Sequence, residues 1–145
     1  MITIFDAGTR QELINRLNAL AENNSPAWGK MNAAQMLRHC RLWEEMIHEN
    51  KLYKRPVIGR LIGPLVLKQI LKQPRLRPNT PTIPEMKISA TDISFEEERQ
   101  KLAGYAAYSV PDNSFIHPFF GKMSREQIGT IAYMHLDHHL RQFGI

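Results

Sequence analysis

The feature that most constrains the fold is a capping pattern that predicts four helix starts. In this pattern a Ser, Thr or Asn is followed three residues later by Glu or Gln, so that two side chains satisfy two free backbone donors at a helix N-terminus. The four pairs are Thr9 with Glu12, Asn32 with Gln35, Ser94 with Glu97, and Ser124 with Gln127. Apolar residues at helical spacing follow each pair, least regularly after Ser94, and they predict four amphipathic helices.

The lengths of the connections predict how these helices are arranged. The first two are joined through residues 23–26, a short connection that favours antiparallel neighbours. About forty residues separate the second helix from the third, which suits a crossover (about 51–92) that returns the chain to its starting end, so these two would run parallel. A short extra helix is expected near Pro64, and the last two helices are joined through residues 110–122. The sequence therefore predicts an all-α single domain over residues 1–145.

Composition favours an ordinary globular protein. Apolar residues make up 43% of the 145 residues, enough for one domain with a hydrophobic core. No apolar run approaches the roughly 20 residues that span a bilayer, and the N-terminal residues do not read as a signal peptide. The single cysteine, Cys40, excludes an intramolecular disulfide, and a reducing, cytoplasmic location is expected.

The positive charge belongs to one segment. Residues 51–84 contain eight basic residues and no acidic one, while the remaining 11 basic and 14 acidic residues give a formal charge of −3. Nucleic-acid binding is disfavoured because Tyr53 is the only aromatic residue available for stacking there. A membrane-surface helix is an alternative, since basic residues Arg60, Lys68 and Lys72 lie beside six apolar residues: Leu61, Ile62, Leu65, Val66, Ile70 and Leu71. We favour a solvated crossover whose apolar face packs on the bundle or on a second subunit.

Three of the six histidines are spaced like the ligands of one metal ion. His135 and His139 lie four residues apart in the last predicted helix and share one of its faces. His39 lies in the middle of the second predicted helix, on the side of Met36 and Trp43. Such a set binds a divalent ion and leaves one coordination position open, which is typical of a catalytic metal site. Zinc, nickel and iron all accept imidazole, so the identity of the metal stays open.

These histidines also have structural interpretations. A lone histidine on an apolar stripe is usually a hydrogen-bonded core residue, and the dipole at the end of the last helix would favour His135 and His138 there. His117 precedes Pro118 and two phenylalanines, and it is a candidate catalytic acid or base at a pocket mouth, because imidazole titrates near neutral pH. The alternative, a histidine that holds the turn into the last helix, ranks slightly ahead.

Other polar residues are weaker candidates. Cys40 follows His39 directly, but adjacent helical residues diverge by about 100°, so a small buried hydrophobe is expected at this position. Glu44, Tyr105 and Tyr108 are candidates for proton transfer or for contacts with the metal ligands. His48, late in the second helix, is expected to be solvated or to cap the helix end.

Two segments resemble the DinB-like (YfiT-like) superfamily of four-helix bundles. They are WGKMNAAQMLRHC, residues 28–40, and HLDHHLRQFG, residues 135–144; HPFFGK at 117–122 is also similar. The resemblance is nearest to a bacterial branch of uncharacterised function. It implies an up-down-down-up bundle with a metal site formed by one histidine of the second helix and an H-x-x-x-H pair of the fourth. Those positions fall on His39, His135 and His139.

The resemblance also implies what such a site does. Dimerisation is frequent in the superfamily, and some members resemble thiol-dependent transferases and isomerases in which the metal activates a low-molecular-weight thiol. A metal with an open position also activates water. We therefore expect a homodimeric metal-dependent enzyme, of hydrolase or thiol S-transferase type, with a small-molecule substrate. The alternative is a non-catalytic binding or interaction protein, whose histidines are structural or whose metal only stabilises the bundle.

Overall fold

The computed structural model describes residues 2–107 and 115–145. This part of the chain is mostly helical, with five α-helices, one 3-10 turn and one small sheet. The elements are α1 (Ala7–Ala19), α2 (Ala33–His48), α3 (Val57–Ile70), η1 (Pro84–Met86), α4 (Phe95–Ala107), β1 (Phe115–His117), β2 (Gly121–Met123) and α5 (Arg125–Gln142). The all-α prediction is thus confirmed at the level of fold class, with the sheet as an addition. Tyr108 and the connection at 110–114 lie outside the described residues.

Capping side chains start the helices largely as predicted. The predicted pairs at the starts of α2 and α5 form complete capping boxes, and Ser94 Oγ accepts a hydrogen bond from the Glu97 amide at the start of α4. The predicted cap of the first helix is wrong. Asp6 caps α1, since its Oδ1 accepts a hydrogen bond of 2.8 Å from the Thr9 amide, and Thr9 lies inside the helix. The Asp6 carboxylate accepts from the Thr9 amide, so the helix begins before the residue that was expected to cap it.

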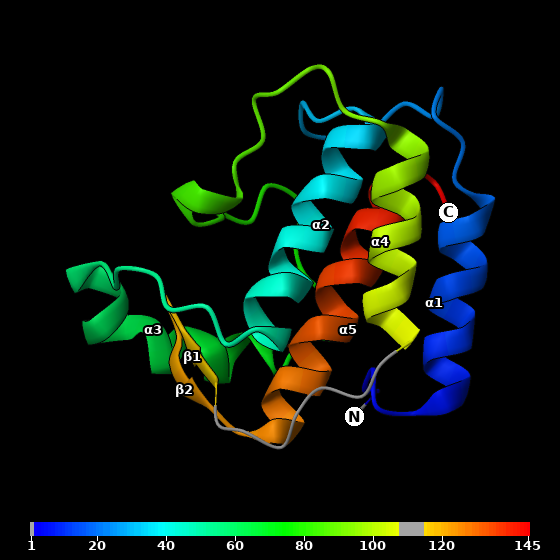
Figure 1. Cartoon of the computed structure of the whole chain (residues 1–145). Helices are drawn as coiled ribbons and strands as arrows, with labels where there is room; N and C mark the ends of the chain where they lie inside the picture. Colours follow the sequence, from blue (N-terminus) through cyan, green and yellow to red (C-terminus); the bar gives the residue numbers. More distant parts are fainter. Residues whose placement is uncertain (1, 108–114) are drawn as a thin grey trace.

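Four of the helices pack along one another. Helix α2 contacts α4 and α5, and α1 contacts the same two helices. In Figure 1, α1 and α5 run upward in the view, whereas α2 and α4 run downward. Fully buried side chains from all four meet between them: Leu13, Leu17, Met36, Leu37, Met46, Leu102, Ile128, Leu136 and Leu140. This packing determines which faces of α2 and α5 are turned toward each other.

The long crossover between α2 and α4 contains α3 and η1. Helix α3 begins at Val57, directly after Pro56, so the expected start near Pro64 is wrong. Pro64 lies inside the helix, where its missing N–H removes one helical hydrogen bond without ending the helix. Figure 1 shows α3 projecting from the packed helices on the side away from α1. None of the helices in the described ranges is long and apolar enough to cross a membrane.

A short hairpin precedes α5 and was not expected from the sequence. Strand β1 pairs antiparallel with β2, with Phe115 opposite Met123. Helix α3 packs closely on the turn of this hairpin, because a Cβ atom placed on Gly63 would lie 2.0 Å from the Phe119 carbonyl oxygen. Only glycine permits this close approach, which holds the hairpin turn against α3.

Candidate metal centre

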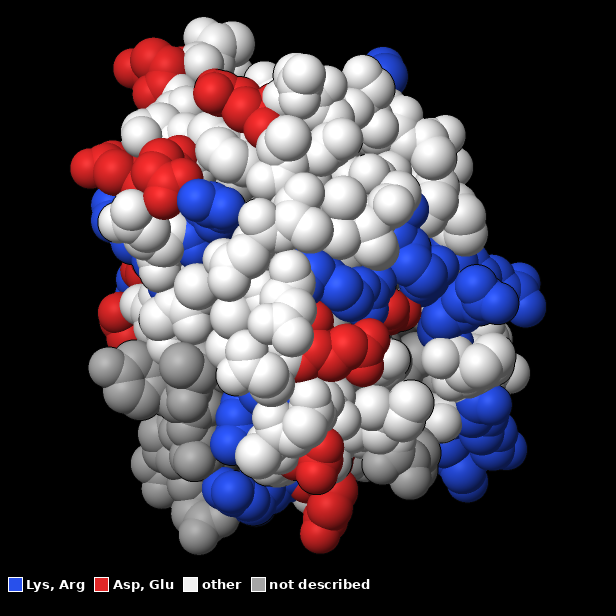
Figure 2. Space-filling view, turned by 90° about the vertical axis from the view of Figure 1, so that its right-hand side faces the viewer, with Lys and Arg blue, Asp and Glu red and all other residues white. Residues whose placement is uncertain are grey.

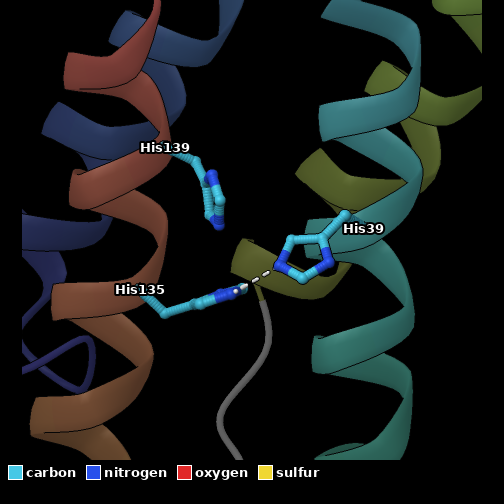
Figure 3. Close-up of side chains that lie close together, drawn as sticks. All are labelled: His39, His135 and His139. Atoms are coloured by element: carbon cyan, nitrogen blue, oxygen red, sulfur yellow. Dashed lines mark hydrogen bonds between the residues drawn. The ribbon is translucent and has the colours of Figure 1, made fainter. Parts of the chain in front are cut away.

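The three histidines selected from the sequence lie together where α2 faces α5 (Figure 3). His39 projects from the middle of α2, and His135 and His139 project from successive turns of α5. The Nε2 atoms of His39 and His135 are 3.1 Å apart, and one ligand nitrogen from each histidine lies within 4.8 Å of the others. Two residues that are 96 positions apart in sequence are therefore in direct contact.

Hydrogen bonds to the outer ring nitrogens orient two of the rings. The Nδ1 atom of His39 lies 2.7 Å from the Met86 carbonyl oxygen in η1, and Nδ1 of His139 lies 2.8 Å from Gln142 Oε1. Both partners are acceptors, so each Nδ1 carries the proton. The Nε2 atoms of these two rings then present lone pairs to the cluster. Gln142 is held in turn, because its Nε2 donates to the Trp28 carbonyl oxygen at 2.6 Å.

Three neutral imidazole rings carry too few protons to give every nitrogen lone pair of this cluster a hydrogen bond. His135 can donate from Nε2 to His39, but it cannot serve the lone pair of His139 at the same time. Its own Nδ1 is buried and has no hydrogen-bond partner among the described residues. A divalent cation between the rings would accept all three Nε2 lone pairs, so the donor set fits a metal ion of the kind that imidazole binds.

The distances also suit an ion. Nitrogens held at about 2.1 Å from a metal lie about 3.4 Å apart at a tetrahedral angle and at most about 4.2 Å apart at any angle. The 3.1 Å pair of His39 and His135 is close to the first value. The widest pair, within 4.8 Å, involves His139 and would close by up to about 1.4 Å to reach the tetrahedral separation.

Burial keeps the three rings neutral and ready to bind a cation. Loss of solvent lowers the pKa of His39, lowers the pKa of His139 to about 3, and lowers the pKa of His135 well below its usual value. The neighbouring imidazoles add to the shift for His135 and His139. Trp43 stacks on the His135 ring with centroids 4.8 Å apart, which removes water from one face of the ring. The lone pairs are therefore available at neutral pH.

A cavity of about 680 Å³ lies beside the cluster, within the usual range for small-molecule sites. All three histidines line it, and its other walls come from α3, the crossover and the hairpin turn. Its apolar lining includes Trp28, Trp43, Ile58, Ile70, Phe119 and Phe120. Among the described lining residues, Lys30 and Lys87 carry charge and none is Asp or Glu.

His117 lines the same cavity but has a defined structural contact. It is 6% exposed, and its Nδ1 accepts hydrogen bonds from the amides of Phe119 and Phe120, at 3.1 and 3.2 Å. Its ring stacks on Phe120, and burial, with a smaller contribution from Arg55, lowers its pKa to about 4. The proton of this neutral ring is therefore on Nε2. His117 holds the hairpin turn, and its catalytic role stays a prediction.

Other sequence candidates lie away from the cluster. Glu44 is buried, which raises its pKa, and its carboxylate lies 3.6 Å from His48 Nε2. His48 was expected to be solvated or to cap the helix end. It lies in the last turn of α2, but its ring packs on Tyr105 and is not fully solvated, because this turn packs against α4. None of these three lines the cavity. Cys40 is fully buried, as expected, and burial raises its thiol pKa.

Two residues that orient the cluster were not predicted. The spacing of Gln142, three residues after His139 on the same helix, was a usable signal, because such pairs are neighbours on a helix. Met86 offered no signal, because it contributes its backbone carbonyl and reaches His39 only through the path of the crossover. His138 lines the cavity but packs its ring against Trp28 and His139.

Comparison with known proteins places the chain in a family. A family model described as "Protein of unknown function (DUF1569)" matches residues 5–144. No curated protein and no solved structure matches the chain. The matched residues run from before α1 to beyond α5 and include the three clustered histidines. The chain therefore belongs to the DUF1569 family of proteins of unknown function.

Proposed function

We propose that the protein is a metal-dependent enzyme that acts on a small molecule at a mononuclear centre formed by His39, His135 and His139. One observation carries the proposal: three neutral imidazoles meet at the wall of a cavity, and two of them have their Nδ1 protons already committed to acceptors. Facing lone pairs repel each other, and one proton from His135 satisfies only one of them. A cation satisfies all three.

A zinc, nickel or iron ion held there would supply Lewis acidity at an open coordination position, which suits a hydrolase or a thiol S-transferase. The chain supplies orientation and exclusion of water. The Met86 carbonyl and Gln142 hold the rings of His39 and His139, which is the role that outer hydrogen bonds have at metal sites. Trp43 covers His135 and fixes its plane.

The cavity favours a substrate with an apolar body. Indole and phenyl rings and branched aliphatic side chains form most of its lining. A cationic substrate is disfavoured, because no acidic side chain from the described residues lines the cavity and a metal with three neutral ligands keeps its positive charge. The proposed substrate class is therefore a neutral or anionic small molecule with an apolar part.

His117 is proposed as a donor to that substrate. Because its Nδ1 is occupied by two backbone amides, its remaining polar atom is the Nε2–H group. A ring whose pKa is lowered to about 4 stays neutral near pH 7, so it donates a hydrogen bond and does not provide a charged acid. This refines the acid or base role expected from the sequence.

We further propose that the four packed helices form a DinB-like four-helix bundle of up-down-down-up topology in a cytoplasmic protein. The opposite directions of α1 and α2, the shared direction of α2 and α4, and the long crossover between them support this topology (Figure 1). A homodimer stays a prediction, which the light-scattering measurement below tests.

A second candidate function is a non-catalytic binding protein with structural histidines. The 3.1 Å contact between His39 and His135 favours it, because this distance also fits a direct N–H to N hydrogen bond. The two functions differ in what they require of His139. A structural pair of His39 and His135 does not need it, whereas a three-ligand metal site does.

Elemental analysis of the protein purified without a histidine tag separates the two. The proposal expects close to one transition-metal ion per chain in the wild type and its loss in His139→Ala, with helical circular dichroism retained. His138→Ala is the matched control, because His138 is an adjacent, equally buried histidine that lies outside the cluster. Metal in both variants, or no metal uptake by the wild type from zinc, nickel or iron salts, would refute the proposed centre.

A further inference from the structure

Helix α3 exposes a ridge of large apolar side chains. Val57, Leu61 and Leu65, spaced four residues apart, are 72%, 71% and 66% exposed, and Ile58 and Ile62 widen the ridge. The opposite face of the helix, with Gly59, Gly63 and Leu67, is buried. The apolar side of the crossover was expected to pack on the bundle or on a second subunit, and within the described chain only one face of α3 is covered. Exposed apolar patches of this kind mark interaction surfaces.

The ridge is surrounded by unpaired positive charge. Six exposed basic residues lie on or near α3 and have no acidic partner among the described residues: Lys54, Arg60, Lys68, Lys72, Arg75 and Arg77. The other side of the molecule differs. Figure 2, which looks onto the side where α1 lies, shows acidic and basic side chains close together. On that side Arg16, for example, pairs with Glu12 and Asp137.

The charge of the surface decides what covers it. The ridge offers on the order of 500 Å² of apolar surface, which is comparable to the apolar share of one side of a standard protein interface, so its area alone does not exclude a second copy of the chain. Two copies joined through it would, however, bring two basic surfaces together, which is unfavourable. Nucleic acid fits poorly, because exposed aliphatic side chains give bases no stacking platform. A surface with an apolar layer beneath negative headgroups matches both features.

We propose that α3 docks the protein on an anionic lipid surface. The helix lies in the plane of the interface, with Leu61 and Leu65 inserted below the headgroups and Arg60, Lys68 and Lys72 against the lipid phosphates. Ile58 and Ile70 of the same helix also line the cavity, so the docked surface adjoins the wall of the candidate site. Docking does not require a metal ion and is independent of the proposed reaction.

Vesicle co-sedimentation of the full chain tests this docking. Vesicles of equal parts phosphatidylserine and phosphatidylcholine should retain the wild type, and pure phosphatidylcholine should retain it far less. The pair Leu61→Gln and Leu65→Gln should lower the partition coefficient about 100-fold, since each buried leucine contributes about tenfold or more. Lys68→Gln with Lys72→Gln should lower it about 25-fold, roughly fivefold for each charge.

Two exposed residues outside α3 are matched controls. Ile2→Gln removes a 57% exposed isoleucine, and Lys101→Gln removes an exposed lysine of α4; both should bind within about twofold of the wild type. No retention on mixed vesicles, equal retention on neutral vesicles, or full retention of the double leucine variant would overturn the proposal. Two results obtained without vesicle binding would also overturn it. One is a wild-type dimer in light scattering that becomes a monomer in the double leucine variant, and the other is binding to duplex DNA.

Discussion

Replacing Gln142 with leucine tests whether the hydrogen bond to His139 prepares a metal site. The change keeps a side chain of similar size but removes the Oε1 acceptor of the His139 Nδ1–H and the donor to the Trp28 carbonyl. His139 can then rotate or change tautomer, and its Nε2 no longer points reliably into the cluster. We expect weaker metal binding together with a modest loss of stability.

The magnitudes follow from these two hydrogen bonds. Losing an outer hydrogen bond to a metal-binding histidine typically weakens metal affinity 10- to 100-fold, which corresponds to about 1.4–2.7 kcal/mol. In the metal-free protein the unsatisfied donor and acceptor lower the free energy of unfolding by about 1–3 kcal/mol. Gln142→Glu restores an acceptor for His139, so it should bind metal at least as tightly as the wild type.

Competition between the protein and a chromophoric zinc chelator measures the change in dissociation constant. Gln100→Leu is the matched control, because Gln100 is an exposed glutamine of α4 whose side-chain amide donates to Glu96, away from the histidine cluster. Its metal affinity should equal that of the wild type. If Gln142→Leu binds zinc as tightly as the wild type while circular dichroism shows a folded protein, the reasoning about the orientation of His139 is wrong.

Two further predictions concern stability. Gly63→Ala should destabilise the protein by about 1–3 kcal/mol in urea unfolding, because its Cβ would lie 2.0 Å from the Phe119 carbonyl oxygen. Gly104→Ala, whose Cβ would meet no atom of the described residues within 4 Å, should stabilise α4 by up to about 1 kcal/mol. Equal effects of the two substitutions would contradict the close packing. The metal-free protein should also lose stability as the pH falls from about 6.5 toward 4, by up to about 1.4 kcal/mol per pH unit for each of His117 and His139. The folded pKa values of about 4 and about 3 lie below the unfolded value of about 6.5, so the unfolded chain binds more protons in this window. Urea unfolding that is independent of pH between 7 and 4.5 would contradict these pKa shifts.

The histidine cluster could be predicted because helical geometry fixes which residues share a face. His135 and His139 follow from their spacing, and His39 follows from its place among the apolar residues of α2. The sequence could not supply the acceptor for His39. That acceptor is the carbonyl of Met86, and its position depends on how a crossover without regular spacing returns to the packed helices.

The fold was predicted best where local chemistry alone decides the outcome. The capping boxes of α2 and α5 are local and were correct. The hairpin was missed because strands of three residues are too short to show an alternating pattern. The start of α3 was misplaced because proline is favoured at the first position of a helix, which made Pro64 look like a helix start. The packing of Gly63 on Phe119, which holds the helix in place, is a tertiary contact that the sequence does not show.

X-ray absorption at the metal edge of the zinc-loaded protein tests the central claim most directly. Three imidazole nitrogens at about 2.0–2.1 Å, with a further light-atom ligand from solvent, are the expected coordination shell. The His139→Ala variant should not retain zinc, so its zinc absorption edge should be absent. A wild-type spectrum with fewer than three imidazoles, or with a sulfur ligand from Cys40, would contradict the proposed centre.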